Sequence, residues 1–180
     1  ETFGGVDVLV NNAGIQHVAP IEEFPAEKWD AIIAINLSSA FHAIKAALPL
    51  MKKAGWGRII NFASLQTARA FENGLAYGAA KGGVGQLTRA MAEAWSRDGI
   101  TANALAPGFF PTELTGPVFA DPARAAANAA QTCIGQNGTL ADILGPALFL
   151  ASPASDYVTG QILYVDGGIT IQLGTRDTPL

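Results

Sequence analysis

Charged residues and cysteine are scarce in this sequence of 180 residues. Only 14% of the residues are Asp, Glu, Lys or Arg, the net charge is −4, and no basic tract occurs. This composition argues against nucleic acid and against an anionic membrane surface as partners. The single cysteine, Cys133, cannot form a disulfide within the chain, so a reducing cytoplasm is the expected compartment.

Long apolar runs are absent as well. No uninterrupted run reaches the roughly 18 residues that a membrane span needs, and no signal peptide heads the sequence. We therefore expect no membrane partner, and we expect no metal centre. What is abundant is apolar content, at 49% of the residues. That amount fits one domain over 1–180 with a sizeable core, or an oligomer that hides further apolar faces.

Short apolar segments alternate with helical patterns along the chain. This alternation predicts an α/β fold with a doubly wound parallel sheet, because each connection is long enough for a crossover. Residues 109–138 contain several prolines and predict a lid with short helices. The tail from Gly174 is polar and is expected to be poorly ordered. The expected strands are 7–10, 58–63, 100–106 and 161–165, and the expected helices are 21–50, 75–97 and 140–151.

The segment from Ser64 to Lys81 carries the strongest chemical signal. Tyr77 and Lys81 are four residues apart, so on a helix they share one face. A nearby ammonium favours the phenolate, so we expect a lowered pKa for Tyr77 and a role in proton transfer. Ser64 ends a strand, and open α/β sheets place ligands at that edge. Right-handed crossovers bring Asn12–Gly14 and Pro107–Gly108 to the same edge.

Asn36 interrupts the apolar stripe of the helix expected at 21–50. A buried asparagine needs hydrogen-bond partners. Two interpretations remain open from the residues alone. In the first, its side chain forms hydrogen bonds with backbone groups at a helix kink. In the second, it holds a water molecule or a catalytic lysine.

Several motifs together resemble the short-chain dehydrogenase/reductase family. They are NNAG at 11–14, INLSSAF around Asn36, Ser64 thirteen residues before Tyr77, YGAAK at 77–81, PGFFPTE at 107–113 and YVDGG at 164–168. They occur in family order and spacing and cover almost the whole chain. Within the family, the sequences of these motifs are most similar to those of gluconate 5-dehydrogenases and are also similar to those of 3-oxoacyl-carrier-protein reductases.

The resemblance implies a Rossmann-like oxidoreductase that uses NAD or NADP. Tyr77 would be the acid/base, Lys81 would lower its pKa and bind the nicotinamide ribose, and Ser64 would orient the substrate carbonyl. Asn36 would hold a water of the proton relay, which favours the functional interpretation of this residue. The implied cofactor contacts are Asn12, Ala13, Gly14, Tyr77, Lys81, Pro107, Gly108, Phe110 and Thr112.

One part of the family pattern does not occur in the sequence. Family members begin with a βαβ unit whose glycine-rich turn binds the pyrophosphate, and no such turn is present. We therefore expect these residues to be the C-terminal part of a longer enzyme, to bind a dinucleotide poorly alone, and to leave one sheet edge exposed. A smaller departure is Gln136, where relatives usually carry arginine. The residue that distinguishes NAD from NADP is absent too.

Three functions follow from these patterns. The first is oxidation or reduction of a small polar substrate, in particular a sugar acid such as gluconate or 5-ketogluconate. In that case Gln16, His17, Gln66 and Arg69 form a polar wall, with Arg69 paired to a carboxylate. The second is a 3-oxoacyl thioester reductase with an apolar pocket beside Phe109 and Phe110. The third is a non-catalytic oligomerising fragment. Apolar and small residues on the helices predict a homotetramer or homodimer.

Overall fold

The protein, represented by a computed structural model, is described here over residues 4–172. Within this range four parallel strands form one sheet in the order β1-β2-β3-β4. The predicted strands are confirmed to within one residue at each end. The tail from Gly174 lies outside the described residues. The strands are β1 (Val8–Asn11), β2 (Gly57–Phe62), β3 (Ile100–Pro107) and β4 (Ile162–Val165).

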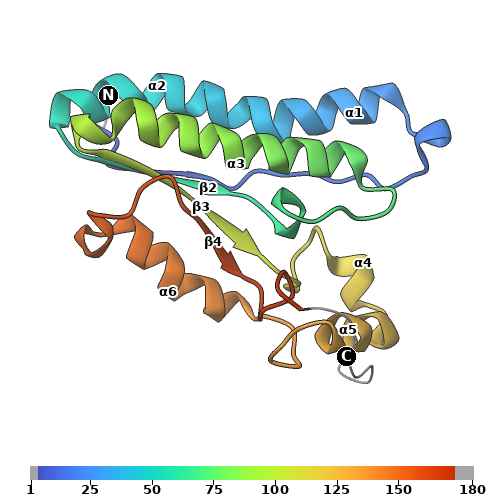
Figure 1. Cartoon of the computed structure of the whole chain (residues 1–180). Helices are drawn as coiled ribbons and strands as arrows, with labels where there is room; N and C mark the ends of the chain where they lie inside the picture. Colours follow the sequence, from blue (N-terminus) through green and yellow to red (C-terminus); the bar gives the residue numbers. More distant parts are fainter. Residues whose placement is uncertain (1–3, 173–180) are drawn as a thin grey trace.

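Helices cover both faces of this sheet, which confirms the doubly wound α/β fold (Figure 1). Side chains alternate along a strand, so Ile59 and Ile60 of β2 point to opposite faces. Ile59 joins a cluster with residues of α2 and α3, whereas Ile60 packs with Leu150 of α6. The helices are α1 (Ala26–Ile33), α2 (Ser39–Ala54), α3 (Leu75–Trp95), α4 (Gly116–Phe119), α5 (Pro122–Ala130) and α6 (Leu140–Ala151).

The first long helix starts later and ends later than the sequence predicts. Residues 21–23 form a 3₁₀ turn, and α1 begins after Pro25, because proline has no N–H for a continuing helix. A π-helical turn at Ala34–Ser38 joins α1 to α2, and Gly55 closes α2 in the left-handed conformation. The whole helix, Ala26–Ala54, is 29 residues long, and an 18-residue window within it has a mean hydropathy of 1.5.

This helix corrects the expectation that no segment is long and apolar enough to cross a membrane. By length and composition alone it passes that test. The sequence pattern missed it because polar residues divide the apolar residues into short runs. In the fold, buried residues of α2 such as Ile44 and Met51 pack against β2 and β3, as in the core helix of an α/β layer.

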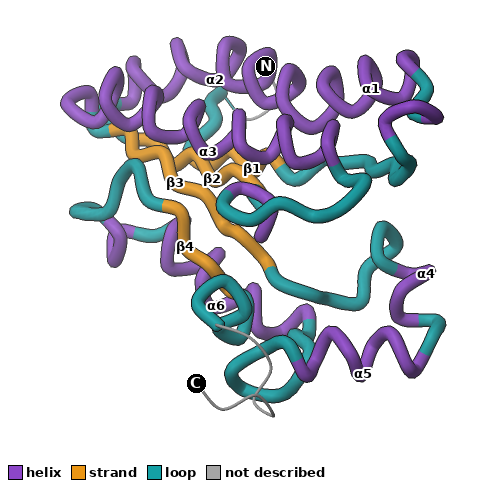
Figure 2. The backbone as a smooth tube through the Cα atoms, turned by 45° about the vertical axis from the view of Figure 1, so that its right-hand side comes forward, coloured by secondary structure: helices purple, strands orange, loops and turns teal. Residues whose placement is uncertain are grey.

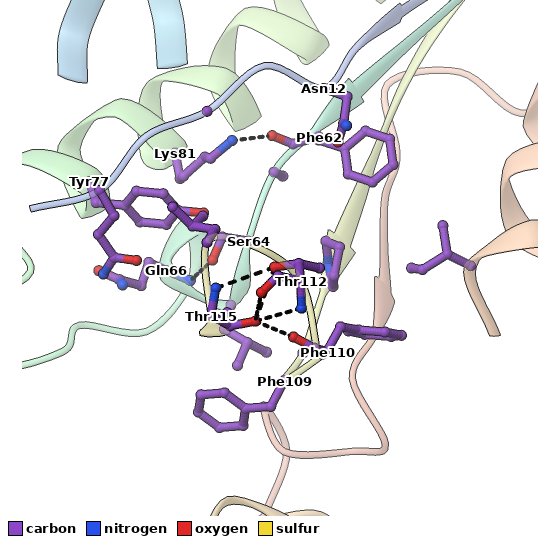
Figure 3. Close-up of a pocket in the computed structure, with 18 of the residues that line it drawn as sticks. Asn12, Phe62, Ser64, Gln66, Tyr77, Lys81, Phe109, Phe110, Thr112 and Thr115 are labelled. Atoms are coloured by element: carbon purple, nitrogen blue, oxygen red, sulfur yellow. Dashed lines mark hydrogen bonds between the residues drawn. The ribbon is translucent and has the colours of Figure 1, made fainter. Parts of the chain in front are cut away.

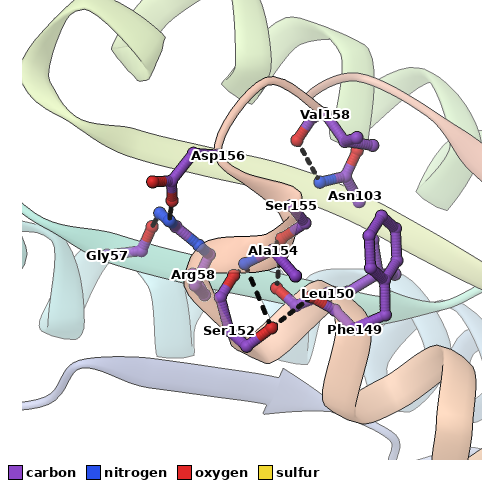
Figure 4. Close-up of polar contacts among 10 residues, drawn as sticks. All are labelled: Gly57, Arg58, Asn103, Phe149, Leu150, Ser152, Ala154, Ser155, Asp156 and Val158. Carbon is purple, nitrogen blue, oxygen red and sulfur yellow. Dashed lines mark hydrogen bonds and ion pairs between the residues drawn. The ribbon is translucent and has the colours of Figure 1, made fainter.

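A buried arginine fixes the loop after α6 to the start of β2 (Figure 4). Arg58 is only 2% exposed, and its guanidinium pairs with Asp156 and lies 4.3 Å from the centre of the Trp56 ring. It also donates to the Gly57 carbonyl at 2.9 Å. This cluster lies at the amino ends of the parallel strands, opposite the carboxyl edge where open α/β sheets bind their ligands.

The segment after β3 leaves the sheet and forms the short helices α4 and α5 (Figure 2). Asp121 caps α5 by accepting hydrogen bonds from the backbone of residues 123 and 124. Short helices in 109–138 were predicted, and the structure contains them. The segment returns to the sheet through Gly138, whose N–H donates to the Phe109 carbonyl at 3.0 Å. It therefore forms one side of the carboxyl edge of the sheet.

Candidate active site

A cavity of about 790 Å³ opens at the carboxyl edge of the sheet (Figure 3). Because β1, β2 and β3 are parallel, the residues that follow them meet at this edge. The segments after β1, β2 and β3 all contribute to the cavity wall, and α3 adds Tyr77 and Lys81. The predicted convergence of these segments is therefore confirmed.

Ser64 and Tyr77 lie together at the cavity wall. Ser64 follows β2 and precedes a 3₁₀ turn, Leu65–Thr67. The backbone N–H of Gln66 donates to Ser64 Oγ at 3.2 Å, which engages the hydroxyl as an acceptor. Its own proton is then available to Tyr77, and this hydrogen bond acts to lower the pKa of Tyr77. The pair can present two hydroxyl groups to one carbonyl oxygen.

Lys81 is buried next to this pair. Its Nζ donates to the Phe62 carbonyl at 2.6 Å and lies 5.5 Å from the centre of the Tyr77 ring. Burial lowers the pKa of Lys81 to about 8, because the ammonium loses hydration that one carbonyl replaces only in part.

The expected direction of the Tyr77 pKa was wrong. Burial raises the pKa of Tyr77 above its ordinary value and outweighs the hydrogen bond from Ser64. The ammonium of Lys81 is directed at the Phe62 carbonyl rather than at the phenol oxygen, so its effect on Tyr77 is small in this arrangement. Tyr77 is consequently protonated at neutral pH and able to donate a proton.

Asn36 supports the cavity from the π-helical turn. It is buried, its Nδ2 donates to the Ile15 carbonyl, and its Oδ1 accepts from the Ile15 N–H, both at 2.8 Å. Asn36 is not among the described residues that line the cavity. Its side chain satisfies backbone groups, as the structural interpretation proposed, although those groups belong to the loop after β1. The role in a water relay stays a prediction.

The predicted cofactor contacts all line the cavity. Small residues from the loops after β1 and β3 leave much of one wall without bulky side chains, and Phe110 packs behind them. The polar groups on the wall include the hydroxyl groups of Ser64, Tyr77 and Thr112 and the ammonium of Lys81. The residues concerned are Asn12, Ala13, Gly14, Tyr77, Lys81, Pro107, Gly108, Phe110 and Thr112.

The structure places two of the four predicted substrate contacts on the cavity wall. Gln16 and Gln66 line the cavity, but Arg69 and His17 do not. Arg69 donates through Nη1 to the Ile169 carbonyl at 2.6 Å, so it ties the loop before α3 to the segment after β4. His17 packs edge-on against Phe24 at 5.3 Å. The structure thus places Arg69 outside the cavity wall, and its pairing with a substrate carboxylate stays a prediction.

Comparisons with known proteins agree with this geometry. A short-chain dehydrogenase model, described as Enoyl-(Acyl carrier protein) reductase, matches residues 1–170. The chain belongs to the short-chain dehydrogenase/reductase family. It is 42% identical over 171 residues to gluconate 5-dehydrogenase of Gluconobacter oxydans, covering 95% of this chain and 67% of that protein. It is also 42% identical over 182 residues to D-beta-hydroxybutyrate dehydrogenase of Rhizobium meliloti, at 96% and 70% coverage.

A solved member of the family has the same fold. The crystal structure of gluconate 5-dehydrogenase from Burkholderia cenocepacia, in complex with NADP and tartrate, is 43% identical. It superimposes with a TM-score of 0.92 over 95% of this chain and 67% of that one. The chain thus spans about two thirds of the length of these dehydrogenases.

Part of the short-chain dehydrogenase cavity was missed by reasoning from sequence. Phe71 lies at the cavity wall and stacks with Phe109, with ring centres 6.3 Å apart. Leu140 and Ile143 also line the cavity, although they belong to α6 on the opposite face of the sheet. A helical pattern alone gave no sign that the first turn of α6 reaches the site. Phe109 had been singled out only for the thioester alternative.

Proposed function

We propose that the protein transfers a hydride between a nicotinamide cofactor, NAD or NADP, and the hydroxy or keto group of a small substrate. The observation that carries this proposal is the grouping of Ser64, Tyr77 and buried Lys81 on one wall of a cavity of about 790 Å³. Solved relatives with bound NADP support the cofactor. When bound, the nicotinamide supplies or accepts the hydride.

The side chains of this protein would carry the proton and the charge. For reduction, Tyr77 donates its phenolic proton to the substrate oxygen, and its raised pKa keeps that proton in place at neutral pH. Ser64 donates a second hydrogen bond to the same oxygen and stabilises its developing negative charge. Lys81 places a positive charge near the phenolate that remains and so stabilises it after the proton has left.

The residues of the cavity fit one half of the cofactor. Thr112 and Lys81 would bind the nicotinamide and its ribose, and the small residues of the loops after β1 and β3 would let a flat ring approach the backbone. Asn36 would support this wall by holding Ile15.

For the substrate we propose a sugar acid such as gluconate or 5-ketogluconate. The names of several relatives and the amide groups of Gln16 and Gln66 in the cavity support it. A 3-oxoacyl thioester is the second candidate, favoured by the Phe71–Phe109 pair and by Leu140 and Ile143 in the wall.

Steady-state kinetics with the natural protein decide between these substrates. Gluconate, 5-ketogluconate, 3-hydroxybutyrate and a 3-oxoacyl thioester are each tested with both cofactors. A kcat/KM at least about tenfold higher for the sugar acid than for the thioester supports the first candidate, a difference of about 1.4 kcal/mol in transition-state binding. The reverse order supports the second. Absence of turnover with every hydroxy and keto compound contradicts the proposed function.

We also propose self-association as a dimer or tetramer. Phe41 of α2 is 50% exposed, and Leu144 and Leu148 of α6 are 62% and 68% exposed, which leaves apolar side chains on both helical layers. Analytical ultracentrifugation tests the proposal, and a stable monomer at micromolar concentration would contradict it.

A further inference from the structure

A threonine outside the cavity links the two elements that carry the candidate catalytic groups. The last ladder bond of β2 before the site is donated by the Ala63 N–H to the Leu105 carbonyl at 2.7 Å. The next residue, Ser64, instead donates its N–H to Thr67 Oγ1 at 3.2 Å. The Thr67 hydroxyl in turn donates to the Lys81 carbonyl of α3 at 3.1 Å. One hydroxyl therefore connects the backbone of Ser64 with the backbone of Lys81.

A glycine in α3 allows Thr67 to approach the helix this closely. A Cβ at Gly85 would lie 2.7 Å from the Thr67 methyl carbon and 3.1 Å from Ile162 Cδ1. The first distance is shorter than side chains tolerate, so any side chain at this position would displace Thr67. The Thr67 methyl group thus occupies the space that the missing Cβ leaves, and the hydroxyl is held against the helix backbone.

We propose that Thr67 is a positioning residue that holds Ser64 in line with Tyr77 and Lys81. This inference rests on the proposed function. Thr67 is not among the described residues that line the cavity, so it does not touch the substrate. It acts through Ser64, which lies beyond the sheet ladder and depends on the 3₁₀ turn for its orientation. A shift of Ser64 would weaken its interaction with Tyr77 in the free protein and the hydrogen bond that it donates to the substrate oxygen once substrate is bound.

The first test compares Thr67→Val with Thr67→Ser. Valine keeps the shape and removes the hydroxyl, and serine keeps the hydroxyl. We expect Thr67→Val to lower kcat by roughly 10- to 100-fold with little change in KM, since small misplacements of catalytic groups have effects of this size. The kcat of Thr67→Ser should stay within about threefold of the wild-type value. Equal losses in both variants, or no loss in Thr67→Val, would overturn the proposal.

The second test uses the contact with Gly85. Gly85→Ala should lower kcat because the new Cβ displaces Thr67. Adding Thr67→Ser should restore most of the loss, because it removes the methyl group that the Cβ meets while keeping the hydroxyl. If the double variant is no better than Gly85→Ala, the two residues do not act together and the proposal fails. This variant pair also covers the case in which Thr67→Val does not fold.

A third measurement does not depend on turnover. Tyrosine labelled at Cζ with ¹³C reports the titration of Tyr77 by NMR, with the signal assigned through Tyr77→Phe. Thr67→Val should raise the pKa of Tyr77, because the hydrogen bond from Ser64 that lowers it is lost. The other ionisable side chains on the described cavity wall, Lys81 and Glu113, are unchanged. An unchanged titration would contradict the positioning role, whereas a wild type without turnover would contradict only the proposed function.

Discussion

The ammonium of Lys81 lies 5.5 Å from the centre of the Tyr77 ring and is directed away from the phenol oxygen, toward the Phe62 carbonyl at 2.6 Å. The two groups are close enough to interact but each is affected mainly by burial. Burial lowers the pKa of Lys81 to about 8 and raises the pKa of Tyr77. Both shifts disfavour the charged forms. The phenol of Tyr77 is therefore neutral, and Lys81 binds its proton less tightly than an exposed lysine does.

The pKa of Lys81 predicts how stability depends on pH. Below about pH 8 Lys81 is charged in both the folded and the unfolded protein, and between about pH 8 and 10.5 only the unfolded protein keeps the proton. The unfolded state then binds more protons, so the free energy of unfolding rises with pH in this window. Between about pH 8 and 10.5, the free energy of unfolding of the wild type should rise by on the order of 3 kcal/mol relative to that of Lys81→Met, at about 1.4 kcal/mol per pKa unit.

Urea unfolding of both proteins at pH 7, 8.5 and 10 measures this difference. Activity should be lost in Lys81→Met at every pH. A constant stability difference between the two proteins over this range would show that Lys81 is not buried as described.

The close contact between Gly138 and Phe110 predicts that Gly138 cannot be replaced without a change in the cavity wall. A Cβ at Gly138 would overlap the buried Phe110 ring, which is part of the cavity wall. We expect Gly138→Ala to raise the KM for the cofactor and to destabilise the fold by about 1–3 kcal/mol, as overpacking does. Gly145→Ala is the matched control, because nothing lies within 4 Å of the new Cβ. In the interior of α6, this control should stabilise by about 0.5–1 kcal/mol.

Calorimetry and cofactor titration separate the two glycine variants. If Gly138→Ala and Gly145→Ala have the same thermal stability and the same affinity for the cofactor, the contact with the Phe110 ring does not determine the shape of the cavity wall.

The Phe71–Phe109 pair predicts substrate preference. The rings are nearly parallel, at 16°, and come from the loops after β2 and β3 on the cavity wall. Phe71→Ala should lower kcat/KM for a 3-oxoacyl thioester by roughly 10- to 100-fold, because burying a phenyl group is worth about 1.5–3 kcal/mol. For 5-ketogluconate the change should be smaller, under about threefold. Tyr157→Ala, at a fully exposed position that does not line the cavity, serves as the control. Equal effects on both substrates would contradict the assignment of this pair to an apolar subsite.

The ion pair of Arg58 and Asp156 predicts an asymmetric effect on stability. Arg58 is buried, whereas the Asp156 side chain is 65% exposed. Asp156→Ala should destabilise by about 3 kcal/mol, since it leaves a buried charge with less compensation. Arg58→Met should destabilise less, because it removes the buried charge and fills the space with apolar atoms. Thermal unfolding of the two variants checks the order, and the opposite order would contradict this account.

The sequence predicted the fold well because its signals are local. Alternation of buried strands and helices placed all four strands, and the helix Leu140–Ala151 was predicted with its end residues. This helix begins after Thr139, whose N–H donates to Asp142 Oδ2 at 2.7 Å. The helix expected at 21–50 was started too early, because Pro25 is the N-cap of α1 and the helix begins only after it.

The site was harder to predict where the partner of a side chain is distant in sequence. Arg69 was assigned to substrate, yet it pairs with the carbonyl of Ile169, 100 residues away. The pKa of Tyr77 was expected to fall, but that expectation used spacing alone and did not include burial. Thr67 carries no motif of its own, and its link to Lys81 appears only once α3 packs against the turn after β2.

The most direct test of the central claim is the turnover of Tyr77→Phe, which removes the phenolic oxygen and leaves the ring. With a substrate identified by kinetics, kcat should fall by at least about 100-fold, the lower end of general acid–base contributions. The Kd for NADPH, measured by fluorescence, should change by less than about threefold. The circular dichroism spectrum of the variant should match that of the wild type, which shows that the fold is unchanged. Retention of wild-type kcat in Tyr77→Phe would show that another group protonates the substrate oxygen and would contradict the account.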